Sequence, residues 1–201
     1  MIIDCISDMH GDEPKLEGGD ILIVAGDCTG RDLPWEWERF FAWVESQNYE
    51  DVILVAGNHD GYLEERTCEH FFSNLKYLED KLLEYKGLRI YGTPWTPIFC
   101  NWHFMLPPGK IQQKWDLIPD NLDILITHGP PYSTLDGTCG NRHGCPHLLD
   151  AVVRAKPKHH VFGHIHESGG KEQITTHTHF HNVSTMNEQY DLVRGAKRII
   201  L

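Results

Sequence analysis

One short segment gives the best indication of how this chain folds: it reads DILIVAGD and covers residues 20–27. Its consecutive apolar residues, rich in Ile and Val, are typical of a buried β-strand. Gly26 and Asp27 follow where that strand should end. Outward from it, short apolar runs that lead into polar, glycine-containing clusters recur at residues 1–7, 51–56, 88–91, 123–127 and 159–162. We therefore expect a buried strand at each of these places.

Helical segments alternate with these strands. Residues 33–47 carry four apolar residues at the i, i+3, i+4, i+7 spacing of one helix face, namely Trp37, Phe40, Phe41 and Val44. Further helices are expected at residues 62–72 and at residues 146–156, where Pro146 suits a first helical turn. Alternation of strands and helices predicts an α/β layer fold. Beyond Lys171 the pattern indicates strands alone, at residues 174–183 and 190–201, and predicts a β-meander.

Length and composition narrow the class of protein. A chain of 201 residues fits one domain, and we expect a single domain over residues 1–201. Hydrophobic residues make up 40% and charged residues 23%, which excludes disordered and collagen-like chains. No apolar run approaches the roughly 18 residues of a membrane helix, and we expect a cytoplasmic protein without a membrane partner. The six cysteines of a chain this long are expected to be reduced thiols.

The net charge of −11 bears on the binding partners. An acidic surface repels phosphate backbones, so we expect no long nucleic acid as a partner. A small phosphorylated substrate stays open, because bound divalent cations reverse the local sign of the charge. The charge does not indicate an oligomeric state.

Polar side chains that bind metals follow five of the predicted strands. They occur in the segments Ser7-Asp8-Met9-His10-Gly11, Gly26-Asp27-Cys28, Gly57-Asn58-His59-Asp60, Thr127-His128-Gly129 and Gly163-His164-Ile165-His166. Ligands of open α/β sheets bind at the carboxyl ends of the strands, where such loops meet. Carboxylate, amide and imidazole donors without thiolates suit Mn, Fe or Zn. They are too many for one ion, and the sequence predicts two ions that share a carboxylate, the arrangement used in phosphoryl chemistry.

These segments resemble the calcineurin-like metallophosphoesterase superfamily, whose pattern is D-x-H, G-D, G-N-H-[DE], a single H and G-H-x-H in that order. The resemblance extends from Asp8 to His166. Residues 91–97, 127–131 and 160–163 are further similar to the metallophosphoesterase-domain proteins of animal brain, regarded as class III cyclic-nucleotide phosphodiesterases. The resemblance implies a four-layer α/β sandwich of two mixed sheets flanked by helices.

The resemblance also implies a set of ligands for two divalent metal ions. We expect Mn, with Fe, Zn, Ni, Co or Mg as alternatives. Asp27 bridges the two ions, with Asp8, His10 and His166 on the first and Asn58, His128 and His164 on the second. The brain-type proteins can have glycine where this chain has His164, so the present chain is closer to the full superfamily pattern.

The implied function is a phosphodiesterase of small phosphodiesters, cyclic or other nucleotides, in which a metal-bridging hydroxide attacks phosphorus in line. We expect His59 to protonate the leaving oxygen and Asp60 to orient the His59 ring. Asn58, His59 and Arg142 are the candidate substrate contacts. The alternatives are a phosphomonoesterase, a nuclease, or a non-catalytic protein-binding scaffold with the same fold.

Other clusters in the sequence have simpler interpretations. His177, His179 and His181 alternate at strand spacing, and we expect an exposed strand face there rather than a metal site. Cys139, His143, Cys145 and His147 match no standard zinc spacing and are expected to be loop residues. Trp95 and Trp102 either stack on a nucleobase or pack within the protein.

Overall fold

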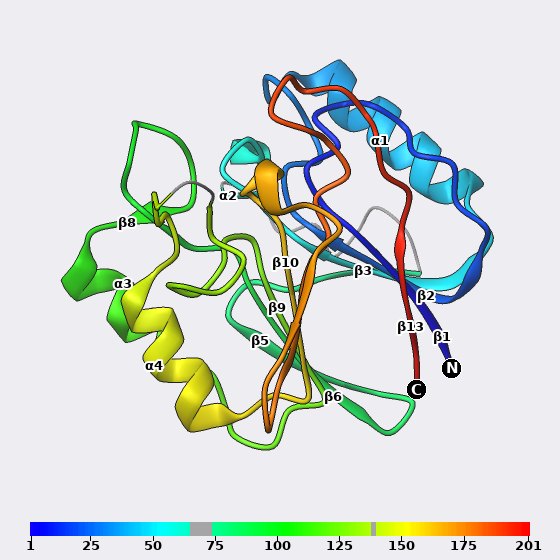
Figure 1. The fold of residues 1–201 in the computed structure, drawn as a ribbon. Helices are drawn as coiled ribbons and strands as arrows, with labels where there is room; N and C mark the ends of the chain where they lie inside the picture. Colours follow the sequence, from blue (N-terminus) through cyan, green and yellow to red (C-terminus); the bar gives the residue numbers. More distant parts are fainter. Residues whose placement is uncertain (65–73, 138–139) are drawn as a thin grey trace.

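Two mixed β-sheets form the centre of the computed structural model, which describes residues 1–64, 74–137 and 140–201 (Figure 1). The first sheet has the order β13-β1-β2-β3-β4, and the second has the order β11-β12-β10-β9-β6-β5. The strands of the first sheet are β1 (Ile2–Ile6), β2 (Gly19–Ala25), β3 (Tyr49–Val55), β4 (Leu75–Tyr77) and β13 (Lys197–Ile200). Those of the second are β5 (Lys81–Tyr85), β6 (Leu88–Thr93), β9 (Ile124–Thr127), β10 (His159–Phe162), β11 (Glu172–Ile174) and β12 (His179–Asn182).

Helices cover the outer faces of the sheets (Figure 1). Helix α1 (Pro34–Ser46) lies on the first sheet, and α3 (Pro108–Trp115) and α4 (Pro146–Ala155) lie on the second. Shorter elements are α2 (Gly61–Glu64), the 3₁₀ turn His166–Ser168 and the pair β7 (Thr96–Pro97) and β8 (Met105–Leu106). None of the helices in the described part of the chain has the length and apolar character of a membrane-spanning segment.

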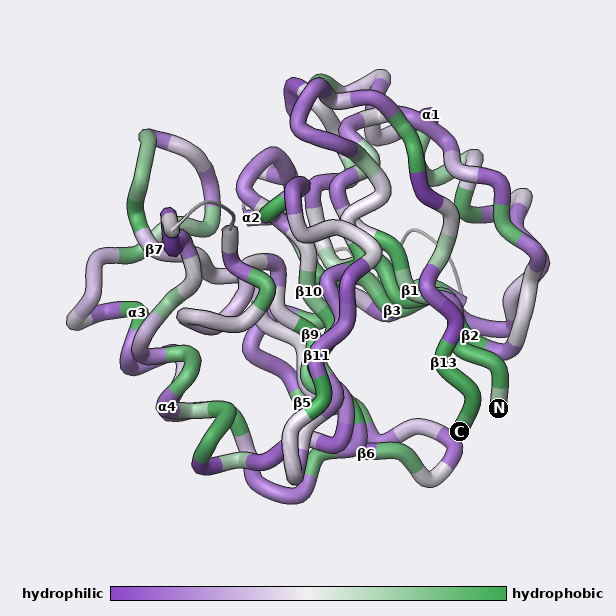
Figure 2. Tube along the Cα trace, viewed as in Figure 1, coloured by the Kyte–Doolittle hydropathy of each residue, from purple (hydrophilic) through white to green (hydrophobic). Residues whose placement is uncertain are grey.

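Successive side chains of a strand point to opposite faces of its sheet, so the hydrophobic core consists of three layers of side chains between the helices and the two sheets. On β2, Ile21 and Ile23 face the second sheet, whereas Leu22 and Val24 face α1. The outer face of the second sheet packs on α3 and α4 through residues such as Phe162. The central strands are accordingly hydrophobic in Figure 2, and the loops beyond them are largely hydrophilic. Helix, sheet, sheet and helix form the predicted four-layer sandwich.

The predicted elements agree with the structure in part. All six predicted strands are present, and so are the helices predicted at residues 33–47 and 146–156. The helix predicted at residues 62–72 falls mostly outside the described residues. The predicted C-terminal meander is wrong, because β12 pairs in parallel with β10, and β13 crosses to the first sheet, where it pairs with β1. Of the predicted meander, only the antiparallel pairing of β11 with β12 is found among the described strands beyond Lys171.

A buried ion pair joins β13 to β1. The Asp4 carboxylate is 2% exposed and accepts hydrogen bonds from Arg198 Nε and Nη2, both at 2.8 Å, and from the Tyr49 hydroxyl at 2.6 Å. Burial alone would raise the pKa of Asp4, but the Arg198 and Tyr49 hydrogen bonds lower it below its usual value of 3.8. The charged carboxylate therefore stabilises the fold.

We expect Asp4→Asn to lower the free energy of unfolding by about 2 kcal/mol at pH 7, because charged hydrogen bonds are lost. A lowered folded-state pKa gives a contribution that is present above the unfolded value and lost as the pH falls through the folded value. The difference between wild type and variant should therefore shrink below pH 3.8. Urea unfolding at several pH values measures it, and a difference that does not change with pH would contradict the assignment.

Candidate metal centre

The polar residues predicted from the sequence meet at one edge, where strands of both sheets end. Asp8 and His10 follow β1, Asp27 follows β2, and Asn58 and His59 follow β3. From the second sheet, His128 follows β9, and His164 and His166 follow β10. The loops converge because β1, β2 and β3 run parallel in the first sheet and β9 and β10 run parallel in the second.

Two groups of donor atoms at this edge hold the residues expected as ligands, and a third, overlapping group joins His10 and Asp27 to His59. Asp8, His10 and His166 offer one ligand atom each within 4.8 Å of one another, and so do Asp27, His128 and His164. Asp27 Oδ2 lies 3.7 Å from His10 Nε2 and 3.4 Å from His128 Nε2, so it reaches both groups. Asn58 Oδ1 joins the second group at 3.1 Å from His128 Nε2. This donor set suits two divalent ions that share the Asp27 carboxylate.

Backbone carbonyls orient two of the imidazoles. His128 Nδ1 lies 2.9 Å from the Ala25 carbonyl oxygen, and His166 Nδ1 lies 3.0 Å from the Asn187 carbonyl oxygen. When Nδ1 donates its proton to a carbonyl, Nε2 keeps its lone pair for a metal. In both residues Nε2 faces the carboxylates. The carbonyl contact at Nδ1 and the free Nε2 are therefore the arrangement found in metal-binding histidines.

The buried carboxylates give the edge a strong negative field. Burial alone would raise the pKa of Asp8, but the hydrogen bond with His166 and the charges of His128 and His166 lower it to about 2. Burial also opposes ionisation of Asp27, yet His128 holds the pKa of Asp27 well below its usual range. In turn, Asp27 outweighs the burial of His128 and raises its pKa to about 9. A field that draws a proton onto buried His128 also favours a divalent cation.

The backbone is strained at the same residues. Asp8, His10, Asp27 and His164 have φ angles of 54°, 44°, 53° and 68°, in the left-handed region that side chains disfavour. Such strain gathers at functional sites, where the surrounding structure enforces it. Gly163 permits the close packing, because a Cβ atom there would lie 2.1 Å from Asp8 Oδ2. The loops thus hold the donors at a cost in backbone energy.

His59 lies beside the two groups of expected ligands and is not itself one of these ligands. Its backbone N–H donates to Asp27 Oδ1 at 2.8 Å, and its Nδ1 lies 2.8 Å from the Gly30 carbonyl oxygen. The ring packs edge-on against His10, with 4.6 Å between centroids, and at a tilt against Trp102, with 4.0 Å between centroids. The Gly30 carbonyl therefore fixes the ring, with Nε2 left for a substrate.

The predicted role of Asp60 in orienting His59 is wrong. Its buried carboxylate accepts hydrogen bonds from the backbone N–H groups of Gly57 at 2.8 Å and Cys28 at 3.0 Å. Burial and the nearby charge of Asp27 raise the pKa of Asp60 to about 7. Through these hydrogen bonds Asp60 connects the loop after β3 to the loop after β2, and it thereby helps to position Asn58 and Asp27.

A cavity of about 720 Å³ opens above the donor groups. His10, Asp27, Asn58, His59, His164 and His166 line its floor, and Phe99, Trp102 and Tyr190 are among its walls. Trp95 lies elsewhere, with its indole N–H on Asp80 at 3.0 Å, and serves packing. Arg142 donates to Asp136 at 2.8 Å and is not among the described lining residues, so its substrate contact stays a prediction.

Sequence reasoning missed several residues of this site. Tyr190 lies 4.9 Å from His10 and 5.0 Å from His166 between ring centroids, and Glu188 lines the cavity mouth. Both follow β12, far from any motif. Phe99 was also missed, although the loop of residues 94–109 was long enough to suggest a functional role. No residue pattern marks the Asn187 and Gly30 carbonyls, because every residue has one.

Comparisons with known proteins identify the family of this chain. Residues 1–168 match the Calcineurin-like phosphoesterase family. The chain is similar to human metallophosphoesterase domain-containing protein 1, with 38% identity over 92% of this chain and 67% of the human protein. It is 37% identical to UPF0046 protein T07D4.2 of Caenorhabditis elegans over 94% of this chain and 57% of the worm protein.

Solved structures have the same fold. One is the phosphopantetheinyl hydrolase of Mycobacterium tuberculosis, with a TM-score of 0.69 and 15% identity over 98% of this chain and 95% of that one. At this identity the likeness concerns the fold alone.

Proposed function

Because this chain belongs to the calcineurin-like phosphoesterase family, we propose that it is a two-metal phosphodiesterase of small phosphodiesters, with cyclic and other nucleotides as the favoured substrates. The observation that carries the proposal is the pair of donor groups that share Asp27 on the floor of the cavity. The family consists of metal-dependent phosphoesterases, and the preference for diesters is the further step.

The proposed ligands are those expected from the sequence. Asp8, His10, Asp27 and His166 hold one ion, and Asp27, Asn58, His128 and His164 hold the other, with Mn²⁺ favoured. Two such ions lower the pKa of a bound water and neutralise charge on the phosphoryl oxygens. In its imidazolium form His59 donates the Nδ1 proton to the Gly30 carbonyl in a hydrogen bond and transfers the second proton, on Nε2, to the leaving oxygen, which leaves a neutral imidazole.

The charge of the cavity supports a diester rather than a monoester. No Lys or Arg is among the described residues that line it, whereas Glu167 and Glu188 lie at its wall. A phosphomonoester dianion carries one more negative charge than a diester and is repelled more strongly by these carboxylates. Phe99, Trp102 and Tyr190 offer aromatic surface to the two organic groups of a diester. The volume of about 720 Å³ is also typical of a small-molecule site.

The test is the hydrolysis of bis-p-nitrophenyl phosphate and p-nitrophenyl phosphate by the same preparation. After chelation and resupply of Mn²⁺, we expect kcat/KM to be at least about tenfold higher for the diester, a difference of about 1.4 kcal/mol. The chelated protein is the control and should be inactive. A preference for the monoester would indicate a phosphomonoesterase, and cleavage of short oligonucleotides a nuclease. Bound metal without turnover of any ester would favour the scaffold.

A further inference from the structure

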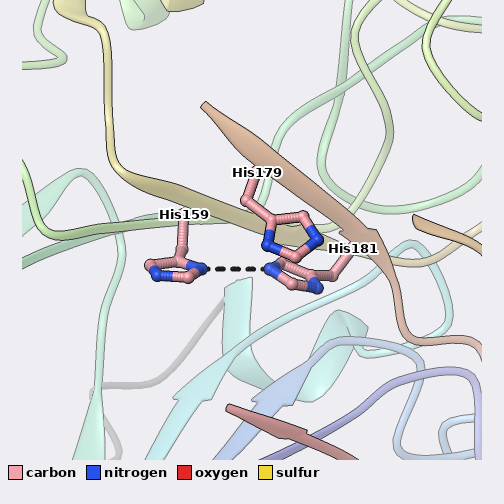
Figure 3. A group of neighbouring side chains, drawn as sticks. All are labelled: His159, His179 and His181. Atoms are coloured by element: carbon pink, nitrogen blue, oxygen red, sulfur yellow. Dashed lines mark hydrogen bonds between the residues drawn. The ribbon is translucent and has the colours of Figure 1, made fainter. Parts of the chain in front are cut away.

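Three histidines gather at the other end of β10 from the candidate centre. His159 begins β10, and His179 and His181 lie on β12 (Figure 3). The parallel register pairs His159 with His179 and Val161 with His181, so the three imidazoles share one face of the sheet. Val161 on this face belongs to the core between the sheets. The prediction of an exposed strand face is therefore wrong: His181 is 2% exposed, and only His177, which precedes β12, is exposed.

The spacing of the three rings suits a metal ion. His159 Nδ1 lies 3.1 Å from His181 Nε2, and the centroids of the His179 and His181 rings are 4.0 Å apart. Each residue offers a nitrogen within 4.8 Å of the other two. Two nitrogens bound to one tetrahedral zinc ion lie about 3.3 Å apart, given Zn–N distances of about 2.0–2.1 Å. The rings therefore need only small rotations to bind one ion.

The burial of these rings also favours a bound metal ion. Burial, together with His179 and His159, lowers the pKa of His181 to about 3, and burial lowers the pKa of His159. Within the described part of the chain, His181 Nδ1 is buried without a hydrogen-bond partner, since the Glu172 carboxylate oxygen at 3.7 Å is too far away for a hydrogen bond. A buried nitrogen left in this way calls for a ligand or a changed partner.

The Glu172 carboxylate lies beside the His179 and His181 rings. Glu172 on β11 places Oε2 at 2.6 Å from His179 Nε2 and at 3.7 Å from His181 Nδ1. Its Oε1 is paired with Lys197 of β13, in the first sheet. Carboxylates in this position accept the outer N–H of metal-binding histidines and fix the ring orientation. For His181, this leaves Nε2, the atom that faces His159, for the metal.

We propose that His159, His179 and His181 bind a further divalent ion, Zn²⁺ or a similar metal, with Glu172 as the orienting carboxylate. Imidazole donors without thiolates suit Zn²⁺, Co²⁺ and Ni²⁺. The ion has access from solvent, because His159 and His179 are partly exposed. It joins β10 to β12 and, through Glu172 and Lys197, links this edge to the first sheet. The site is separate from the candidate centre, because its ligands lie at the opposite end of β10.

The test counts metal ions bound to the chain of residues 1–201. Metal-stripped protein is dialysed against Zn²⁺ or Co²⁺, and bound metal is measured by elemental analysis for wild type, His179→Ala and His177→Ala. We expect His179→Ala to bind one equivalent less than wild type, and His177→Ala, the matched control in the same segment, to bind as much. Glu172→Gln should weaken this equivalent by about 10–100-fold. The cobalt form should lose the absorption of one tetrahedral ion in His179→Ala.

The result does not depend on the proposed phosphodiesterase. The difference of one equivalent is expected whether the candidate centre holds two ions or none. Circular dichroism shows whether His179→Ala is folded. The same number of equivalents in wild type and in folded His179→Ala would overturn the proposal, as would a loss in His177→Ala of the same size. If His179→Ala does not fold, His159→Gln provides the same comparison at a partly exposed position.

Discussion

Asp27→Asn is expected to lower kcat/KM for a phosphodiester by about 10³-fold or more, equivalent to about 4 kcal/mol of transition-state stabilisation. Asp27 Oδ2 is the atom that reaches both donor groups, at 3.7 Å from His10 Nε2 and 3.4 Å from His128 Nε2. An asparagine has nearly the same shape but no negative charge to hold two cations. Bound metal, measured by elemental analysis, should fall together with activity.

The control for this variant is Asp12→Asn, which removes an exposed carboxylate from the loop that follows β1. It changes the net charge equally but lies outside both donor groups. We expect its metal content and its kcat/KM to equal those of wild type. A folded Asp27→Asn protein that binds two ions and keeps a tenth of the wild-type kcat/KM would rule out the shared carboxylate.

The position of the site was predictable because it follows from topology. Once β1, β2 and β3 are recognised as neighbouring parallel strands, Asp8, Asp27 and Asn58 must lie at the same edge. The resemblance to the superfamily, now confirmed, supplied the order of the segments. What no motif predicts is the contribution of residues beyond β12. Tyr190 reaches His10 and His166 only because the chain returns from β12 toward β13 over this edge.

Side-chain direction within a loop was less predictable than loop position. Asp60 follows His59 directly, and this adjacency suggested a hydrogen bond between the two side chains. In the turn after β3, however, the Asp60 carboxylate points inward to the N–H groups of Gly57 and Cys28. A buried turn must satisfy its backbone donors, and a short carboxylate close by in sequence does so. The ring of His59 then takes a carbonyl, that of Gly30, as its partner.

The alternation of His177, His179 and His181 shows a related limit. A period of two places side chains on one face of a strand but does not tell whether that face is buried. The answer depends on the neighbouring strand, and β12 lies in parallel beside β10 rather than in a meander. His181 therefore becomes buried. Strand pairing between segments about 20 residues apart is a tertiary property that local patterns do not encode.

His59→Ala is expected to lower kcat by about 10³-fold for a diester whose leaving group is a nucleoside alcohol, within the usual range for general acid catalysis. The Gly30 carbonyl accepts the Nδ1 proton, so the imidazolium form of His59 carries its second proton on Nε2, available to a substrate in the cavity. A p-nitrophenolate leaving group is stable without a proton. With bis-p-nitrophenyl phosphate the same variant should therefore lose much less, about tenfold, through weaker stabilisation of charge. The measurement is kcat for both substrates at saturating Mn²⁺.

The comparison between leaving groups separates proton donation from a structural role. His59 also donates its backbone N–H to Asp27 Oδ1, so a disturbed loop would slow both substrates equally, because the metal ligand itself would shift. His103→Ala is the matched control, since this exposed imidazole pairs with Glu64 and is not among the cavity residues. It should leave both rates unchanged. Equal losses for the two leaving groups in His59→Ala would assign His59 to positioning of Asp27, whereas unequal losses in the predicted direction require a proton on Nε2.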